Sequence, residues 1–135
     1  MEKITLQATL ENLAVATDFI VSSLEEKDCS MKIIMQMELV IEEIFVNVAN
    51  YAYAPKVGEV EISKDFDEEP RAVEIVFTDS GVPYNPLDNE DPDVTLAAED
   101  RKIGGLGIFL IKKNVDAIDY EHKDGKNILR IKKFF

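Results

Sequence analysis

Residues 31–53, MKIIMQMELVIEEIFVNVANYAY, form the longest helical pattern in the chain and predict the helix on which the fold is built. At about 100° per residue, its large apolar side chains gather on one side, where we expect the core. They are Met37, Ile41, Ile44 and Val48, whereas Glu38 and Glu42 fall on the far side, where solvent belongs. Ser30 precedes the first turn and is a suitable N-cap.

A polar stripe runs along the same predicted helix, within an arc of roughly 60° beside apolar neighbours. It consists of Gln36, Glu43, Asn47 and Asn50. A carboxylate and an amide oxygen one turn apart can hold Mg²⁺ between them and a phosphate, because Mg²⁺ needs few protein oxygens and keeps several waters. The carboxylate could also orient or deprotonate an attacking hydroxyl. Taken alone the stripe is weak support for function, since partly solvated residues at the edge of a buried face are more common.

Shorter patterns on both sides of this helix predict a layer of helices over one sheet. Helices are predicted over 12–26 and from Gly104 to about Val115, and strands over 4–10, 58–67, 71–79, 117–123 and 127–134. Turns fit at residues 67–70 and at Asp124-Gly125, which predicts two antiparallel hairpins. No repeat or linker divides the chain. We therefore expect a single domain over residues 1–135, an α/β (α+β) two-layer sandwich with a mainly antiparallel, mixed sheet and three helices.

The end of the 71–79 strand carries a second group of candidate residues, in FTDSGVPYNP at residues 77–86. An acid at this point, Asp79, can accept a hydrogen bond from an amino group deep in a pocket, such as the exocyclic amine of adenine. Gly81 allows the backbone to approach a flat ring without a Cβ, and Pro83 stiffens the exit from the turn. An Asp-Ser-Gly turn that only closes a strand explains these residues equally well.

Glycines at the start of a predicted helix form the third group, in IGGLGIFLIKK at residues 103–113. Free backbone N–H groups and the helix dipole at such a start favour phosphate, and glycines allow its close approach. A flexible loop joined to a buried helix would give the same pattern. The acids from Asp88 to Asp100 lie in the long irregular segment before it, which is of a kind that is usually functional or disordered.

Composition argues against several classes of function. The chain has 135 residues, of which 46% are hydrophobic, enough for one core. A formal net charge of −12 at pH 7 disfavours direct nucleic-acid binding and docking on an anionic membrane. The single cysteine, Cys29, cannot form an internal disulfide, and no apolar run reaches the roughly 18 residues that span a membrane. We expect a cytoplasmic protein with no nucleic-acid or membrane partner.

In this order and spacing, the three groups resemble the N, G1 and G2 boxes of the GHKL ATPase and kinase superfamily. The corresponding segments are EIFVN at 43–47, DSGVP at 79–83 and GGLGIFLIKK at 104–113. They are most similar to the anti-sigma factor serine/threonine kinase branch, and the resemblance covers nearly the whole chain. Two positions depart from the common pattern. Tyr51 stands near the place of a frequent His, and Pro83 replaces a glycine of the wider superfamily, as is usual in this branch.

The resemblance implies the Bergerat ATP-binding fold and a site for ATP and Mg²⁺. It implies that Glu43 is the general base or water-orienting carboxylate, that Asn47 is a Mg²⁺ ligand, and that Asp79 binds the adenine amine. Residues 84–103 would be an ATP lid. The nucleotide-binding residues that it implies are Asn47, Asn50, Asp79, Gly81, Pro83, Gly104, Gly105, Leu106 and Gly107.

The leading hypothesis is an ATP-dependent serine/threonine protein kinase that regulates transcription. By resemblance it would phosphorylate a STAS-domain antagonist protein, bind a sigma factor and act by partner switching, as a possible homodimer. The alternative is a catalytically weak ATP-binding regulatory module that signals through protein contacts. Glu43 argues against this alternative, because a pure binder needs no base. A histidine kinase catalytic domain is rejected, because the only histidine, His122, falls in a predicted strand.

Overall fold

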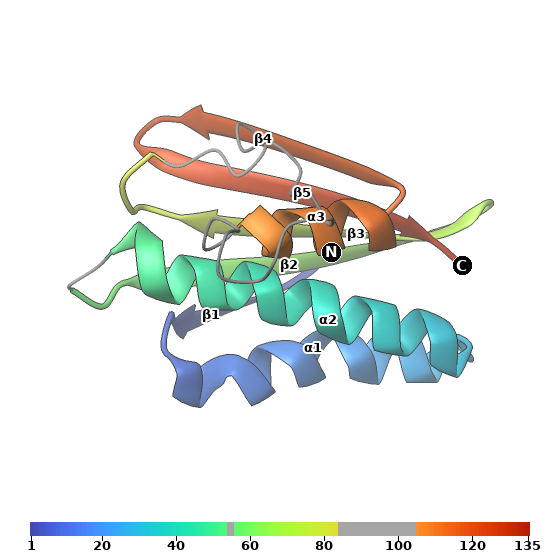
Figure 1. The fold of residues 1–135 in the computed structure, drawn as a ribbon. Helices are drawn as coiled ribbons and strands as arrows, with labels where there is room; N and C mark the ends of the chain where they lie inside the picture. The colour runs from blue at the N-terminus through green and yellow to red at the C-terminus, as the bar shows by residue number, and fades with distance from the viewer. Residues whose placement is uncertain (54–55, 84–104) are drawn as a thin grey trace, which may run out of the picture.

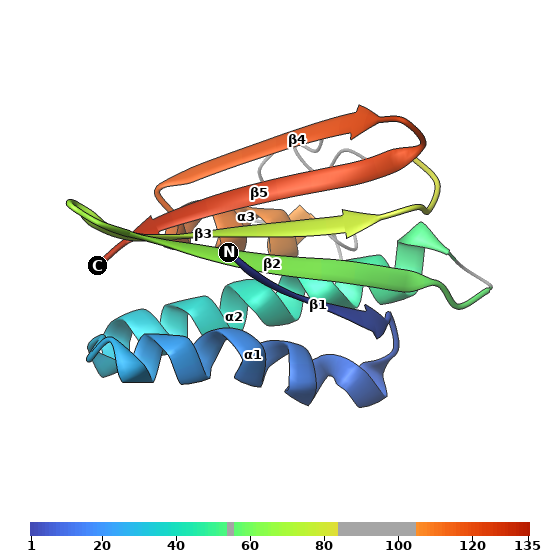
Figure 2. The same ribbon diagram turned by 180° about the vertical axis from the view of Figure 1, so that it is seen from behind.

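The computed structural model describes residues 1–53, 56–83 and 105–135, which form a five-stranded sheet with helices on one face (Figure 1). The strands are β1 (Glu2–Gln7), β2 (Glu59–Glu68), β3 (Arg71–Asp79), β4 (Ala117–Lys123) and β5 (Lys126–Phe134). The helices are α1 (Leu13–Glu26), α2 (Met31–Asn47) and α3 (Gly105–Asn114), with a 3₁₀ turn η1 (Leu10–Asn12) and a π-helical turn η2 (Val48–Ala52). Figure 2 shows the opposite face of the sheet, which these helices leave uncovered.

The sheet has the strand order β1-β2-β3-β5-β4, and each of these neighbouring pairs is antiparallel. This confirms the predicted two-layer fold and both hairpins, although the described strands contain no parallel pair and the sheet is therefore not mixed. Asp124 and Gly125 have φ angles of 54° and 76°. Two positive φ angles in a row are what the tight turn between β4 and β5 requires, and the Asp-Gly pair adopts them readily.

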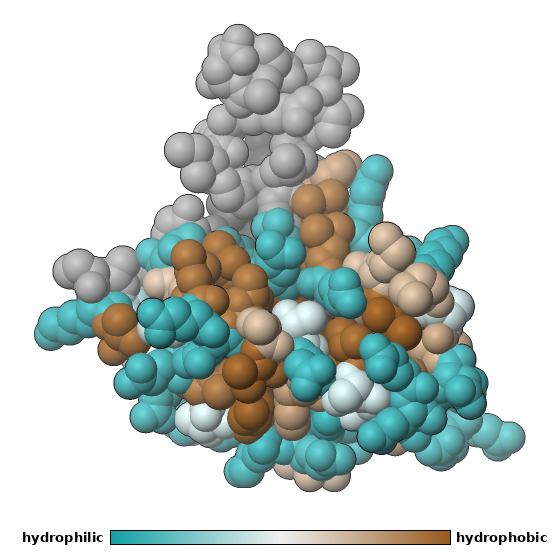
Figure 3. All heavy atoms as spheres, turned by 90° about the horizontal axis from the view of Figure 1, so that it is seen from below, coloured by the Kyte–Doolittle hydropathy of each residue, from teal (hydrophilic) through white to brown (hydrophobic). Residues whose placement is uncertain are grey.

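The core lies between the sheet and the helices, with α2 packed between α1 and α3. Met37, Ile41 and Ile44 of α2 are buried, as their helical spacing predicted, whereas Val48 is partly buried. The surface on the α1 side of the molecule is mixed. Figure 3, seen from the side on which α1 lies, shows apolar patches separated by hydrophilic side chains. None of the helices in the described ranges is long and apolar enough to cross a membrane.

Two predicted element ends are wrong. β1 ends at Gln7 and not at residue 10, because hydrogen bonds from Thr9 N to Gln7 O and from Asn12 N to Thr9 O turn the chain into η1. The α-helix predicted over 31–53 ends at Asn47 and continues as the π-helical turn η2. Its beginning is confirmed, since the Ser30 hydroxyl accepts a hydrogen bond from Ile33 N at 3.3 Å.

Candidate functional site

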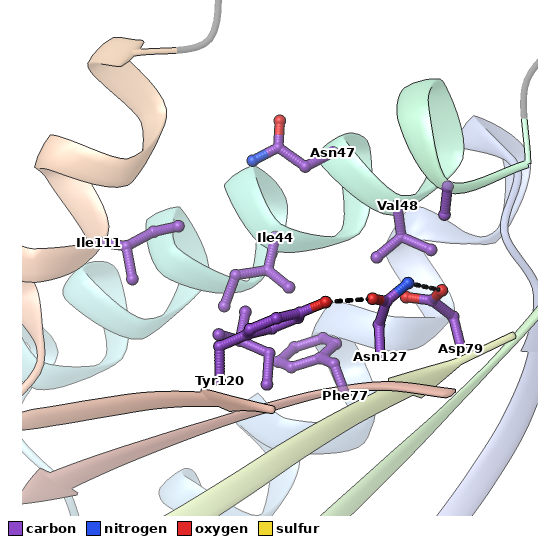
Figure 4. Close-up of a pocket in the computed structure, with 10 residues that line it drawn as sticks. Ile44, Asn47, Val48, Phe77, Asp79, Ile111, Tyr120 and Asn127 are labelled. Carbon is purple, nitrogen blue, oxygen red and sulfur yellow. Dashed lines mark hydrogen bonds between the residues drawn. The ribbon is translucent and has the colours of Figure 1, made fainter. Parts of the chain in front are cut away.

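A small pocket lies between the helices and the sheet, beside the end of β3 and the beginning of β5 (Figure 4). Its volume is about 50 Å³. The walls are apolar and come from α2, η2, α3 and the strands: Ile44, Val48, Ala52, Phe77, Ile111 and Leu129. The polar lining residues are Asn47, Asp79, Tyr120 and Asn127. An apolar cavity with a few convergent polar groups is the usual composition of a small-molecule site.

Strand geometry places the two most buried of these polar residues next to each other. Side chains alternate along a strand, and the buried row Val73, Ile75 and Phe77 of β3 continues to Asp79. Asn127 begins the corresponding buried row of β5 and lies directly across from Asp79 in the strand pairing. Asp79 is 7% exposed and Asn127 is 6% exposed. The helix-covered face of the sheet therefore ends in a polar pair at the floor of the pocket.

Hydrogen bonds fix this pair. Asp79 Oδ1 accepts from Gly81 N and from Asn127 Nδ2, each at 2.9 Å. Asn127 Nδ2 also donates to Val82 O at 2.9 Å, and the Tyr120 hydroxyl donates to Asn127 Oδ1. Figure 4 shows Tyr120, Asn127 and Asp79 in a row along the sheet side of the pocket. The carboxylate is thus held by a chain of polar contacts across the neighbouring strands β3, β5 and β4.

The turn after Asp79 packs against the end of η2. Val82 N donates to Ala52 O at 2.8 Å, and a Cβ added to Gly81 would lie 2.2 Å from the same oxygen. Gly81 was predicted to allow a close approach of the backbone to a ring. The close approach in this structure is to the Ala52 backbone, which alone is sufficient to require glycine.

Tyr53 ties this turn to the beginning of β2. Its hydroxyl donates to Glu59 O at 2.6 Å and accepts from Ser80 N at 2.7 Å. Its ring fills the space that a Cβ on Gly58 would enter, because that Cβ would lie 2.2 Å from a ring carbon. Burial raises the pKa of the Tyr53 hydroxyl, and the nearby Asp79 charge adds to the rise, although the hydrogen bond from Ser80 opposes it.

The structure places the residues of the polar stripe, on α2 and η2, in different surroundings. Asn47 lines the pocket, and its side chain points away from Asp79 and Asn127 (Figure 4). Glu43, one turn earlier, is half-buried and is not among the lining residues, whereas Asn50 is exposed on η2. Gln36 Oε1 is buried without a hydrogen-bond partner in the described part of the chain. Burial raises the pKa of Glu43 above its ordinary value, and repulsion by Glu42 raises it further.

Comparison with known proteins assigns the family. Residues 6–133 match the family described as "Histidine kinase-like ATPase domain". The chain belongs to this family. It is 28% identical over 131 residues to the serine-protein kinase RsbW of Bacillus cereus (strain AH187), a match that covers 94% of this chain and 74% of that protein. It is 30% identical over 100 residues to RsbW of Bacillus mycoides (strain KBAB4), covering 71% of this chain and 61% of the relative.

Two solved structures share the fold. The RsbU and RsbW domains of a Mycobacterium tuberculosis protein match 99% of this chain and 32% of that chain, with a TM-score of 0.67 and 13% identity. A histidine kinase domain from Erythrobacter litoralis matches 90% of this chain and 60% of that chain, with a TM-score of 0.55 and 12% identity. The predicted GHKL-type α/β fold and the predicted resemblance to the serine kinase branch of this family are therefore confirmed.

The remaining site residues predicted for this kinase-like ATPase domain are not among the residues that line the pocket, or lie outside the described residues. Gly105, Leu106 and Gly107 form the first turn of α3, and Pro83 is exposed at the end of the described turn. Gly104 and the predicted lid over 84–103 lie outside the described ranges. Within those ranges no cluster of three or more His, Cys, Asp or Glu side chains could hold a metal ion.

Three residues of the ATPase-domain site were missed from the sequence: Tyr53, Tyr120 and Asn127. A pattern was available for one of them. Asn127 alternates with Leu129 and Ile131 in the predicted strand 127–134, and this alternation puts a polar residue at a core-facing position. The sequence around Tyr53 and Tyr120 does not distinguish them from ordinary aromatic residues. Their hydrogen-bond partners, Ser80 and Asn127, come close to them only in the tertiary fold.

Proposed function

We propose that this chain binds Mg·ATP in the pocket beside Asp79 and is a serine/threonine protein kinase of the anti-sigma factor type. The observation that carries the proposal is the buried Asp79 carboxylate at the floor of an apolar pocket, in a family of kinase-like ATPases. Its Oδ1 is occupied by two N–H donors. The carboxylate can therefore offer Oδ2 to the exocyclic amine of adenine, between the apolar side chains of Ile44, Val48 and Phe77.

The phosphate end of the nucleotide is proposed to lie toward Asn47 and the beginning of α3. The backbone N–H groups of the first turn of an α-helix have no partners within the helix, and glycines at 105 and 107 would allow phosphate oxygens to approach the start of α3. Asn47 is the proposed protein ligand of Mg²⁺, with Asn50, Pro83, Gly104 and Leu106 as further nucleotide-binding residues. Bound Mg²⁺ would neutralise phosphate charge in the transfer step.

Glu43 is proposed to take the proton from the hydroxyl of the protein substrate. It lies one turn before Asn47 on α2, so both would serve the same end of the nucleotide. The raised pKa of Glu43 supports this role, because a carboxylate that holds a proton more strongly is a better base near neutral pH. The proposed substrate is a Ser or Thr of a STAS-domain antagonist protein. The proposed regulatory partner is a sigma factor, in the cytoplasm and with a homodimeric kinase.

The binding proposal is tested by calorimetric titration with ADP and Mg²⁺. We expect the unmodified chain to bind ADP, and Asp79→Asn to bind it on the order of tenfold to a hundredfold more weakly. The carboxylate accepts a hydrogen bond from the adenine amine, whereas an amide can place its own N–H donors against that amine. Ser30→Ala, at the far end of α2, is the control for a general loss of stability. If the unmodified chain does not bind ADP, the pocket is not a nucleotide site.

The kinase proposal is distinguished from a non-catalytic ATP-binding module by Glu43→Gln. We expect this variant to bind ADP like the unmodified chain but to transfer no radiolabelled phosphate to a STAS-domain protein of the same organism. Glu38→Gln, on the exposed side of α2, is the matched control and should retain transfer. Transfer that persists in Glu43→Gln would remove Glu43 from the chemistry. Nucleotide binding without any transfer would favour the regulatory module.

A further inference from the structure

We infer that Asn127, oriented by Tyr120, is a positioning residue that holds Asp79 in the orientation that selects a nucleobase with an amino group. This inference rests on the proposed nucleotide site. It concerns two residues that lie outside the three sequence segments from which the site was predicted. They come from β4 and β5, next to the strand that carries Asp79.

The orientation of the Asn127 amide is determined by its neighbours. Its oxygen accepts the Tyr120 hydroxyl, and its nitrogen donates to Asp79 Oδ1 and to Val82 O, both at 2.9 Å. An amide has two N–H donors on one side and an acceptor on the other. Rotation of the amide by 180° would break the bond from Tyr120. It would also place the amide oxygen against a carboxylate and a carbonyl, which are both acceptors.

This orientation decides which oxygen of Asp79 is available to a ligand. Oδ1 receives two hydrogen bonds, one from its own turn through Gly81 N and one from β5 through Asn127. Oδ2 receives none from a described residue. Because Asp79 and Asn127 are buried, the carboxylate cannot exchange these donors for water without a cost. The pocket therefore presents one acceptor, at a fixed position, on its polar floor.

A fixed carboxylate oxygen discriminates between nucleobases by their chemistry. Adenine offers an exocyclic N–H at this edge, whereas the hypoxanthine of inosine offers an oxo group, which is another acceptor and would be repelled. A site built to hydrogen-bond one partner rejects the analogue that cannot make the bond, because its own buried polar group is left unpaired. If Asp79 could rotate, the carboxylate would lose this fixed acceptor and much of the discrimination.

The test compares the binding of Mg·ADP and Mg·IDP, the inosine diphosphate, by calorimetry. Asn127→Leu keeps the approximate shape of the side chain and removes both donors and the acceptor. Tyr120→Phe removes only the hydroxyl that orients the amide. We expect the unmodified chain to prefer ADP by at least tenfold. We expect Asn127→Leu to lose most of that preference through weaker ADP binding, with IDP binding changed by less than about threefold. Tyr120→Phe should lose a smaller part.

Ser30→Ala is the control, because it lowers stability without touching the pocket and should leave the ratio of the two affinities unchanged. A merely structural role of Asn127 would weaken ADP and IDP equally and keep their ratio, and that result overturns the inference alone. A ratio of ADP to IDP affinity that is unchanged in both Tyr120→Phe and Asn127→Leu would also overturn the inference. If the unmodified chain binds neither nucleotide, the proposed function itself fails, and the inference fails with it.

Discussion

At the scale of single residues, Glu43 differs from the other acids of α2 in its surroundings. Glu38 and Glu42 are exposed, whereas Glu43 is half-buried beside apolar neighbours. Burial is the larger cause of its raised pKa, and the charge of Glu42 is the smaller cause. Since the pKa of Glu43 is higher in the folded chain than in the unfolded chain, folding favours its protonated form. This contribution to stability is present at low pH and is lost as the pH rises through the raised pKa.

Replacing Glu42 with Gln should therefore lower the pKa of Glu43 while leaving it above the ordinary value for Glu, because burial remains. The measurement is the pH titration of the Glu43 side-chain carboxyl by carbon-13 NMR. Glu38→Gln is the matched control, since Glu38 is an exposed acid of the same helix and should leave the midpoint unchanged. A midpoint that does not move in Glu42→Gln would show that the two carboxylates do not interact.

At the scale of elements, the pocket depends on the contact between η2 and the turn after β3. Gly81 and Val82 lie against Ala52, and the Tyr53 hydroxyl joins the same turn to β2. The π-helical turn lies at this contact, in line with the frequent occurrence of such turns at functional sites. The elements that hold Asp79 are therefore themselves held by backbone-to-backbone approach, which tolerates no added side-chain atom.

Gly81→Ala should destabilise the chain by about 1–3 kcal/mol or more, because its Cβ would overlap the Ala52 backbone and force the turn away. Nucleotide binding should weaken as well, since Gly81 N would no longer reach Asp79 Oδ1. Chemical denaturation and ADP titration measure the two effects. Gly125→Ala is the control. Gly125 has a φ of 76° with open space around it, so Ala there should cost about 1 kcal/mol and leave ADP binding intact. Equal ADP affinities of Gly81→Ala and the unmodified chain would contradict this account.

The elements themselves could be predicted well from local patterns. The Ser30 cap, the hairpin turn at Asp124-Gly125 and the alternation that ends in Asp79 all depend on neighbours in sequence, and the structure agrees with them. The π-helical turn after Asn47 could not be predicted from local patterns. Ala52 and Tyr53, at its end, contact segments that are distant in the sequence. Asn50 was assigned to the stripe on the assumption of a continuous α-helix, and the structure leaves it exposed on η2.

The contact between Asn127 and Asp79 could not be predicted from the sequence either, because it too joins segments that are distant in the chain. Their pairing depends on β5 lying beside β3, which are 48 residues apart at this point. The alternation of polar and apolar residues within a strand does not show which strands are neighbours in the sheet. The family resemblance indicated the proposed site segments, which are local in sequence, but it did not include Asn127 or Tyr120.

At the scale of the whole molecule, the net negative charge opposes folding. The formal net charge is −12 at pH 7, and the ion pairs of the described residues have at least one well-exposed partner. Such surface pairs contribute little, typically about 0–1 kcal/mol each. Mutual repulsion among acids therefore opposes folding and is weakened by salt, because the Debye length falls to about 8 Å at physiological ionic strength.

We expect the thermal midpoint to rise by about 3–6 °C between 20 mM and 500 mM NaCl at pH 7, which corresponds to roughly 1 kcal/mol for a domain of this size. Circular dichroism in a temperature scan measures it. At pH 5, where part of the carboxylates are protonated, the rise should be smaller. A midpoint that falls with salt at pH 7 would mean that ion pairs outweigh repulsion.

Val82 has a hydrogen-bonded backbone and an exposed side chain. Its N–H is bound to Ala52 O and its carbonyl to Asn127 Nδ2, while its side chain is 60% exposed. The backbone is therefore anchored from both sides, although the side chain projects into water beside the pocket. A fluorophore attached at this residue would be linked to a backbone that hydrogen bonds hold on both sides. Any change in its emission on adding nucleotide would report what arrives next to it, and not the movement of its own attachment point.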